Sequence, residues 1–366
     1  MAKKHLKIIK LRSKCGVPEK YVKSRSKKPY GKLLHYITKS DSQSNNAKVA
    51  AIDIGSNTVR LLIGRLQDGR LERMESIREV TRLAKDLCSK GALNSDSNAL
   101  SIRSLIEFKV TCDRYGVGQI IAVGTSALRE AADTDAFLRL IKAKTGIDVK
   151  VISGETEADL TIKGISWGQE QAGVNPVCSV MVDIGGGSTE LILNCDANAK
   201  FSLPLGAVKL FELFIKHDIP SAYDLSLLSA HILAELDRAV SIIKMKINSR
   251  PCALIATGGT PATLAAIHLT MDSYDGNRVH GMRLPYSAIR KMYERIISVP
   301  LNVRSSIIGL ETSRADIIIP GIMIMLSLMD MLGVQETVVS DYGLMEGILY
   351  DLLCPADKSA ERDHVL

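Results

Sequence analysis

Several signatures of common protein classes are missing from this sequence of 366 residues. It has no GxxxxGK(S/T) loop, so the usual P-loop route to phosphate is absent. Its seven histidines show no HxxxH spacing, which argues against a hydrolase whose metal is held by histidines. The longest apolar run begins at Ile317, but Pro320 and Asp330 break it and it is too short to span a bilayer comfortably. We therefore expect no membrane segment.

Signals for secretion and for disulfide bonding are also weak. The lysine-rich N-terminus is not followed by the apolar segment of a secretory signal. The cysteines number seven, which is odd, and they show no CxxC spacing. Because disulfides are rare in reducing compartments, this pattern predicts reduced cysteines and a cytoplasmic protein.

Acidic residues are scarce only at the N-terminal end. Residues 1–46 hold 13 lysines and arginines against two acids, while the whole chain has a net charge of +7. We expect residues 1–47 to form a basic, flexible extension. The chain as a whole is 46% hydrophobic and 24% charged, as in soluble globular proteins, and it is long enough for two domains.

What the sequence does contain is one strand–loop–strand pattern that occurs twice. AIDIGSNTVRLLIG, residues 51–64, and MVDIGGGSTELIL, residues 181–193, align without a gap at the Asp-Ile-Gly core. Each begins three short strands, followed by helical patterns that alternate with strands. This order predicts an α/β fold built from two copies of one layout, with domains at 48–168 and 169–355 and a tail at 356–366.

Both loops carry the residue types that bind phosphate. Glycines let several backbone N–H groups point into one concavity, and serine or threonine adds hydroxyl donors. Asp53 and Asp183 precede the loops and could hold Mg²⁺ against the phosphate. A single DIG loop could instead be an ordinary hairpin turn, but two at equivalent places favour one phosphate cleft between the domains.

Three further segments carry candidate chemistry. Gly258 and Gly259 stand between a strand and a helix, where backbone N–H groups could face an anion. Arg129 follows another strand and either addresses the same anion or lies on a helix surface. Glu157 lies in the first turn of a helix, where an acid either complements the helix dipole or activates water at the edge of the cleft.

Taken together, the motifs resemble those of the exopolyphosphatase and guanosine pentaphosphate phosphohydrolase (Ppx/GppA) family. This family is part of the actin, hexokinase and sugar-kinase superfamily, so the resemblance implies two ribonuclease H-like domains with a cleft between them. The likeness runs from about Lys48 to Leu353. The segments that carry it, in chain order, are AIDIGSNTVRLLI, VGTSALREAAD, ISGETEADLTIKGI, VDIGGGSTELIL, LPLGAVKL, ATGGTPATLAAI, RADIIIPG and SDYGLMEGIL.

The resemblance implies an Mg²⁺-dependent enzyme that hydrolyses the terminal phosphate from polyphosphate, or the 5′ γ-phosphate from guanosine pentaphosphate. On this chain the implied catalytic residues are Glu157, Arg129 and Glu190, and the implied metal ligands are Asp53, Asp183 and Glu190. The residues expected to bind substrate are Gly55, Ser56, Asn57, Thr58, Gly185, Gly186, Gly187, Ser188, Thr189, Gly258 and Gly259. A homodimer is also expected, since members of the family often dimerise.

The sequence departs from the family pattern at two positions. Asp159 and Met345 stand where an Arg is found in some relatives, so two anion contacts are in doubt. The chain also ends soon after the second domain, which is expected of the short, two-domain form.

Two other functions remain open at this stage. A superfamily kinase would use the same loops for ATP, and a sensor protein would bind a nucleotide or polyphosphate without cleaving it. The basic extension either contacts polyphosphate or a nucleic acid, or it is a solvated segment or an overlong start of the reading frame. Deleting residues 1–46 and measuring polyphosphate affinity across a salt series separates these alternatives.

Overall fold

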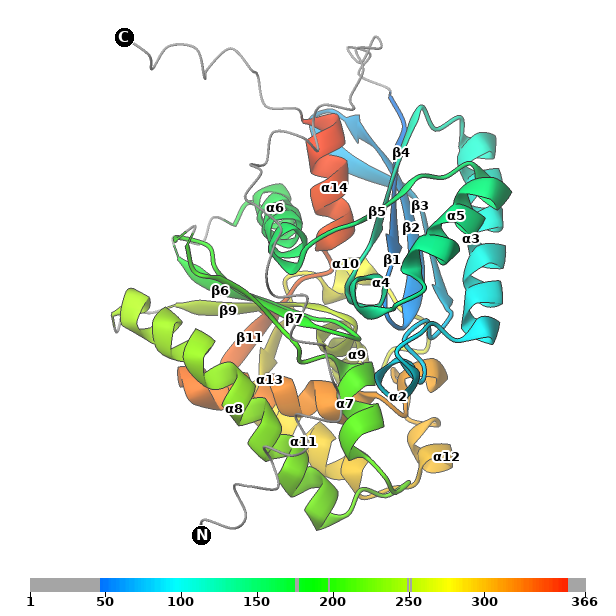
Figure 1. The fold of residues 1–366 in the computed structure, drawn as a ribbon. Coiled ribbons are helices and arrows are strands. Elements are labelled where there is room, and N and C mark those ends of the chain that lie inside the picture. Colours follow the sequence, from blue (N-terminus) through cyan, green and yellow to red (C-terminus); the bar gives the residue numbers. More distant parts are fainter. Residues whose placement is uncertain (1–46, 175–177, 197, 249, 251, 355–366) are drawn as a thin grey trace. The chain divides into compact units, whose positions relative to one another are not determined.

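The computed structural model describes residues 47–174, 178–196, 198–248, 250 and 252–354. The predicted basic extension, apart from Ala47, and the predicted C-terminal tail lie outside the described residues. Within them the chain forms two sheets flanked by helices, as the sequence predicts (Figure 1).

The first sheet has five strands in the order β3-β2-β1-β4-β5. An antiparallel meander of β1 (Val49–Ile54), β2 (Thr58–Gln67) and β3 (Arg70–Val80) comes first. β4 (Gln119–Gly124) then pairs with β1 in parallel, and β5 (Val149–Val151) pairs with β4. The predicted meander and the two later strands are therefore confirmed.

The central strand β1 is buried on both faces of this sheet, its successive residues pointing to opposite sides. Ala50, Ile52 and Ile54 pack in one cluster with residues of α3 (Ser95–Tyr115) and α5 (Thr134–Thr145). Val49 and Ala51 pack in another cluster with residues of α6 (Gly154–Gln171) and α14 (Leu344–Leu353). Figure 1 shows these two pairs of helices on opposite sides of the sheet. Burial on both faces explains the continuous apolar run of β1.

The second sheet repeats this layout with one added strand. Its order is β10-β11-β9-β6-β7-β8, so that β8-β7-β6-β9-β11 corresponds to β3-β2-β1-β4-β5. The strands are β6 (Ser179–Ile184), β7 (Thr189–Leu193), β8 (Lys200–Leu203), β9 (Ala253–Gly258), β10 (Arg283–Pro285) and β11 (Glu336–Val339). The prediction that the halves share one layout is confirmed.

Helices cover the second sheet as well. α8 (Ala222–Ile247) and α13 (Ile318–Leu332) contribute to the core on one face, and α6 packs at Met181, Ile192 and Ile255 on the other. Ser221 caps the N-terminus of α8, its hydroxyl accepting from the Asp224 N–H in a capping box. The remaining helices are α2 (Leu87–Lys90), α4 (Ser126–Glu130), α7 (Ala207–Phe214), α9 (Gly259–His268), α10 (Gly276–Val279), α11 (Tyr286–Ile297), α12 (Leu301–Arg304) and η4 (Thr312–Arg314).

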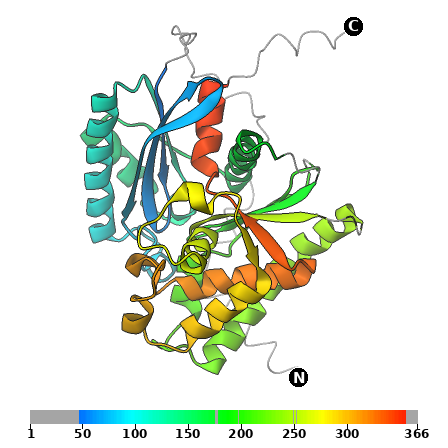
Figure 2. The ribbon, with the colours of Figure 1, turned by 180° about the vertical axis from the view of Figure 1, so that it is seen from behind.

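α6 and α14 lie side by side in both views of the ribbon (Figures 1 and 2). Their contact depends on glycine, because a Cβ on Gly347 would overlap the Leu160 carbonyl and one on Gly164 would overlap the Gly343 carbonyl. The backbones therefore approach closely at this point. α14, from the C-terminal end of the described chain, in this way completes a face of the first sheet, while the domain boundaries stay a prediction.

The cysteines differ from the expectation at one pair. Cys178 and Cys195 are joined by a disulfide, although the sequence analysis expects reduced cysteines. They flank the β6–β7 hairpin, which brings them together although they are 17 residues apart in the sequence. The spacing of the cysteines in the sequence does not by itself predict this bond. Cys112, Cys252 and Cys354 are free thiols.

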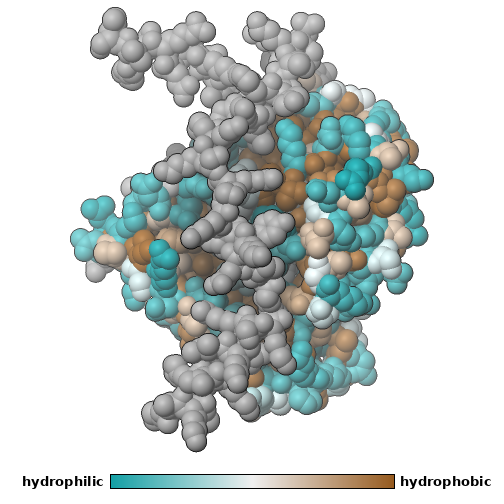
Figure 3. All heavy atoms as spheres, viewed as in Figure 1, coloured by the Kyte–Doolittle hydropathy of each residue, from teal (hydrophilic) through white to brown (hydrophobic). Residues whose placement is uncertain are grey.

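No helix in the described part of the chain is long and apolar enough to cross a membrane. On the face drawn in Figure 3, hydrophilic and hydrophobic side chains are interspersed over the helices at its right-hand edge, α3 and α5. Leu100, Ile106 and Val110 of α3 are among the exposed apolar side chains. Scattered exposure of this kind is ordinary for a protein surface.

Candidate active site

The two glycine loops have the same turn and meet each other. The Gly55 N–H donates to the Thr58 carbonyl at 3.0 Å, and the Gly185 N–H donates to the Ser188 carbonyl at 3.0 Å. A Cβ on Gly187 would lie 2.5 Å from the Ser56 hydroxyl oxygen, so only glycine allows this approach. The predicted convergence of the loops on one cleft is confirmed.

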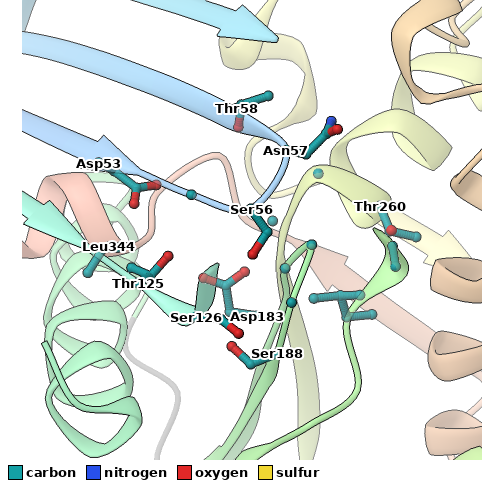
Figure 4. Close-up of a pocket in the computed structure, with 18 of the residues that line it drawn as sticks. Asp53, Ser56, Asn57, Thr58, Thr125, Ser126, Asp183, Ser188, Thr260 and Leu344 are labelled. Carbon is teal, nitrogen blue, oxygen red and sulfur yellow. The ribbon is translucent and has the colours of Figure 1, made fainter. Parts of the chain in front are cut away.

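The cleft collects most of the residues that the sequence predicts. Figure 4 shows the Asp53, Ser56 and Asp183 side chains turned toward the same space. The predicted residues that line it are Asp53, Gly55, Ser56, Asn57, Thr58, Glu157, Asp183, Gly185, Gly186, Gly187, Ser188, Glu190, Gly258 and Gly259. Thr125, Ser126 and Thr260 add hydroxyl groups to the lining.

Two predicted residues lie outside this lining. The Thr189 side chain is fully buried in β7 and its hydroxyl donates to the Leu205 carbonyl, so it supports the loop rather than facing the cleft. Arg129 stands behind the cleft, where its guanidinium donates to the Glu157 carboxylate at 2.6 Å and to the Ile152 carbonyl at 3.0 Å. Its other terminal nitrogen lies 3.5 Å from the Ser188 hydroxyl.

Asp53 is paired within the first hairpin. Its Oδ2 accepts from Arg60 Nη2 at 2.6 Å and Nε at 3.1 Å, while its buried Oδ1 has no hydrogen-bond partner among the described residues. Burial alone would lower the pKa of Arg60, but the Asp53 carboxylate more than offsets this effect and raises that pKa. Arg60 is therefore a permanent cation in the cleft.

The other three acids are crowded, and among the described residues only Glu157 has an ion-pair partner, Arg129. Burial raises the pKa of Asp183 to about 6, although Arg60 opposes the shift. Burial also raises the pKa of Glu157 to about 7 against the opposing effect of Arg129. The pKa of Glu190 is raised well above its usual range, first by burial and then by Glu157 and Asp183. The cleft thus holds negative charge that a cation would stabilise.

The helix α6 presents Glu157 from its first turn. Ser153 caps this helix by accepting from the Thr156 N–H at 3.1 Å, which fixes where the helix begins. Glu190 reaches the same place from β7, where its Oε1 accepts from the Ser202 hydroxyl at 2.8 Å. One acid from a helix and one from a strand therefore share the cleft, as in the predicted site.

The structure brings in two arginines that the sequence analysis omits. Arg60 lies across the strand pair from Asp53, as Glu190 lies across from Asp183, so the loop alignment contained the signal for it. Arg314 arrives from η4, and its guanidinium lies so close to Gly259 that a Cβ there would overlap it. Burial and the nearby Arg78 and Arg60 guanidinium groups lower the pKa of Arg314 to about 10, while Glu311 opposes the shift.

The two departures from the family pattern have structural roles. Asp159 forms an ion pair with Lys200 of β8. Met345 is buried in the cluster that joins α14 to the first sheet. Neither residue lines the cleft.

The carboxylates of the cleft are candidate ligands for Mg²⁺. No group of three His, Cys, Asp or Glu side chains in the described residues is close enough to hold a metal ion alone. Mg²⁺, however, usually binds through one or two carboxylates together with waters and substrate phosphates. One or two of the cleft acids Asp53, Asp183 and Glu190 could serve in that way, and the Asp53 Oδ1 has no hydrogen-bond partner among the described residues.

Comparison with known proteins agrees with this geometry. Residues 62–355 match the Ppx/GppA phosphatase family. The fold is thus the actin-like, ribonuclease H-like fold of a phosphatase family, which confirms the predicted fold class. The chain belongs to the Ppx/GppA phosphatase family.

Individual relatives align over most of the chain. Exopolyphosphatase 2 of Mycobacterium tuberculosis (strain CDC 1551 / Oshkosh) is 26% identical over 319 residues, which cover 83% of this chain and 98% of that protein. The crystal structure of the Aquifex aeolicus member of the Ppx/GppA family is 31% identical with a TM-score of 0.70, covering 84% of this chain and 97% of that one. An exopolyphosphatase from Cytophaga hutchinsonii is 27% identical with a TM-score of 0.74, covering 83% and 97%.

Proposed function

We propose that this protein is an exopolyphosphatase that releases terminal orthophosphate from linear polyphosphate with the help of Mg²⁺. The observation that carries the proposal is the meeting of two glycine loops with Glu157, Asp183 and Glu190 in one cleft. The loops offer backbone N–H and hydroxyl donors to phosphate oxygens, and the acids offer a base and metal ligands.

Glu157 is the candidate general base. It lines the cleft, and its raised pKa of about 7 matches the requirement that a base accept a proton near neutral pH. In the step we envisage, water attacks the terminal phosphorus, its proton passes to the Glu157 carboxylate, and the bond to the bridging oxygen breaks. The shortened chain leaves with the electron pair of that bond.

Arg129 fits a positioning role. Its ion pair holds the Glu157 carboxylate, and its second terminal nitrogen lies near Ser188 of the second loop. A phosphate bound at Ser188 would therefore be placed beside the base. Phosphoryl transfer depends mainly on such positioning and on cations around the transferred group, which Arg60 and Arg314 supply from the cleft walls.

Mg²⁺ would be held by one or two of Asp53, Asp183 and Glu190 together with waters and the substrate phosphate, and when bound it would neutralise charge on the phosphate oxygens. Because Arg60 pairs with Oδ2 of Asp53, Oδ1 is the oxygen of Asp53 that is left to contact the metal.

Guanosine pentaphosphate is the second candidate substrate, because it presents a similar terminal phosphoanhydride. A kinase or a phosphate sensor would use the same loops. The match to a phosphatase family favours hydrolysis over these alternatives.

Phosphate release by purified protein with Mg²⁺ tests the proposal. Long-chain polyphosphate and guanosine pentaphosphate are compared side by side, with and without a chelator, and with Glu157→Gln as the inactive control. Release from polyphosphate that needs Mg²⁺ and Glu157 supports the proposed activity. Binding without release from either substrate, or transfer to an acceptor with ATP, would contradict it.

A further inference from the structure

We infer that Arg78 is a further substrate-binding residue, which holds the polyphosphate chain beyond its terminal phosphates as the chain leaves the cleft. This inference rests on the proposed polyphosphate substrate and adds a binding position to the same site. Three observations support it: the register of the strands, the ion pairs that link Arg78 through Glu311 to Arg314, and a second cavity.

The first observation is a row of residues across the first sheet. Asp53 pairs in register with Arg60, and Arg60 pairs with Arg78 on the next strand. Side chains directly opposite each other across strand pairs point to the same face. Arg78 therefore stands on the face that carries Asp53 and Arg60, about 10 Å from Asp53 when two strand spacings are counted.

The second observation is that Arg78 is linked to an arginine of the cleft. Its guanidinium forms an ion pair with Glu311, and the other oxygen of Glu311 accepts from Arg314 Nε at 3.2 Å. Glu311 thus lies between the two guanidinium groups, holding Arg314 by its Nε edge. Arg314 lines the phosphate cleft, while the side chain of Arg78 is 37% exposed.

The third observation is a second cavity that shares a wall residue with the cleft. Arg78 lines this space of about 140 Å³ with the acids Glu311 and Asp272 and with Thr263 and Tyr274, and Gly259 belongs to the walls of both this cavity and the cleft. A chain whose end lies between the glycine loops could therefore pass Arg314 at Gly259 and reach Arg78.

The path combines three arginines with the carboxylates of Asp53, Glu311 and Asp272. Arg60, Arg314 and Arg78 follow one another from the loops outward, with Asp53 and Glu311 as their only ion-pair partners among the described residues. In the structure Glu311 acts as the counter-ion that a phosphate group would replace. Guanidinium groups are well suited to phosphate oxygens, which they bind through paired hydrogen bonds.

The corresponding row in the second sheet differs in charge. There Asp183 pairs with Glu190 and Glu190 pairs with Ser202, so the same positions hold an acid and a hydroxyl. The cationic row exists on one side of the cleft only. This asymmetry gives the chain one direction of exit, across the first sheet and past Arg78.

Steady-state phosphate release by the full-length protein with Mg²⁺ tests the inference on tripolyphosphate and on long-chain polyphosphate. Arg78→Gln is expected to raise KM for the long chain about tenfold, the loss of one charged hydrogen-bonding group, while kcat stays within about twofold. The effect on tripolyphosphate should be much smaller. Arg78→Lys, which keeps the charge, should recover part of the lost affinity for the long chain.

Arg65→Gln is the matched control, since Arg65 is paired with Glu72 on the same pair of strands, away from the cleft. It should leave KM for both substrates unchanged. An equal change in KM for both chain lengths, an unchanged KM, or an effect on kcat alone in Arg78→Gln would overturn the inference. Thermal unfolding of each variant shows whether the fold is intact, and Arg78→Lys provides the test if Arg78→Gln does not fold.

Failure of the proposed function gives a different result. If the wild-type protein releases no phosphate from either chain, the polyphosphatase proposal fails irrespective of Arg78. If the wild type is active but Arg78→Gln does not raise KM more for the long chain than for tripolyphosphate, only the inference about Arg78 is wrong.

Discussion

Arg60 and Glu190 occupy the same position in the two hairpins, each directly across the strand pair from the aspartate that precedes its glycine loop. Arg60 neutralises Asp53 in the first hairpin, whereas Glu190 adds a second acid beside Asp183 in the other. One repeated backbone therefore presents opposite charges to a single cleft. The first hairpin therefore adds a cation to the cleft at the position where the second adds an acid.

The activity should depend on pH through Glu157. A base works only when it is deprotonated, so kcat/KM should rise with pH through about 7, the raised pKa of this carboxyl. Glu157→Gln should lower kcat by about 10²- to 10⁴-fold and remove this ascending limb. The control is Glu155→Gln, an exposed acid in the same turn of α6, which should behave as wild type. A Glu157→Gln variant with an unchanged pH–rate profile would exclude Glu157 as the base.

The free energy of unfolding should change with pH in the direction opposite to the activity. The folded protein holds the Glu157 proton with a pKa of about 7, against 4.5 in the unfolded chain, so the folded state binds more protons between these values. The free energy of unfolding of the wild type should therefore fall as pH rises from about 4.5 to about 7. This fall in the free energy of unfolding amounts to about 1–3 kcal/mol, and it should be absent in Glu157→Gln because the amide does not titrate.

Urea unfolding without metal at pH 5 and at pH 8 measures this effect. Glu157→Gln should gain stability relative to the wild type at pH 8 compared with pH 5. A relative gain at pH 5 instead would mean that the buried carboxyl is held in its charged form.

Gly259→Ala should weaken substrate binding by moving Arg314. The new Cβ would overlap the Arg314 guanidinium, which is the far end of a flexible side chain and can shift without disturbing the backbone. KM should rise about tenfold, while the free energy of unfolding changes by no more than about 0.5 kcal/mol. In an Arg314→Ala background the same change should have little further effect on KM, because the group it displaces is gone. Additive effects in the double variant would disprove the link.

Gly347→Ala should destabilise the fold at the crossing of α6 and α14. Here the new Cβ would meet the Leu160 carbonyl, which belongs to backbone and cannot turn away. Forcing the helices apart should cost about 1–3 kcal/mol in the free energy of unfolding. Gly118→Ala is the control, since its nearest contact would be 3.8 Å away. Chemical denaturation of both variants measures the difference, and equal stability would mean that the helices separate freely.

Much of the fold and the core of the site could be predicted from the sequence. The repeated DIG loops fixed the two meanders, because alternating apolar residues and glycine turns act within a few neighbours of the chain. The loop glycines and the acids Asp53, Asp183, Glu157 and Glu190 follow from the same local patterns together with the family resemblance.

Tertiary structure alone decided which charges meet. Arg314 reaches the cleft from a segment far along the chain, and the disulfide between Cys178 and Cys195 depends on how the β6–β7 hairpin closes. Thr189 is a residue that the sequence wrongly places in the cleft lining. Its hydroxyl lies in the core, where it donates to the Leu205 carbonyl. Local sequence patterns determine which helices and strands form. Which side chains become buried and which charges pair depends on contacts between distant parts of the chain, and these contacts cannot be predicted from local patterns.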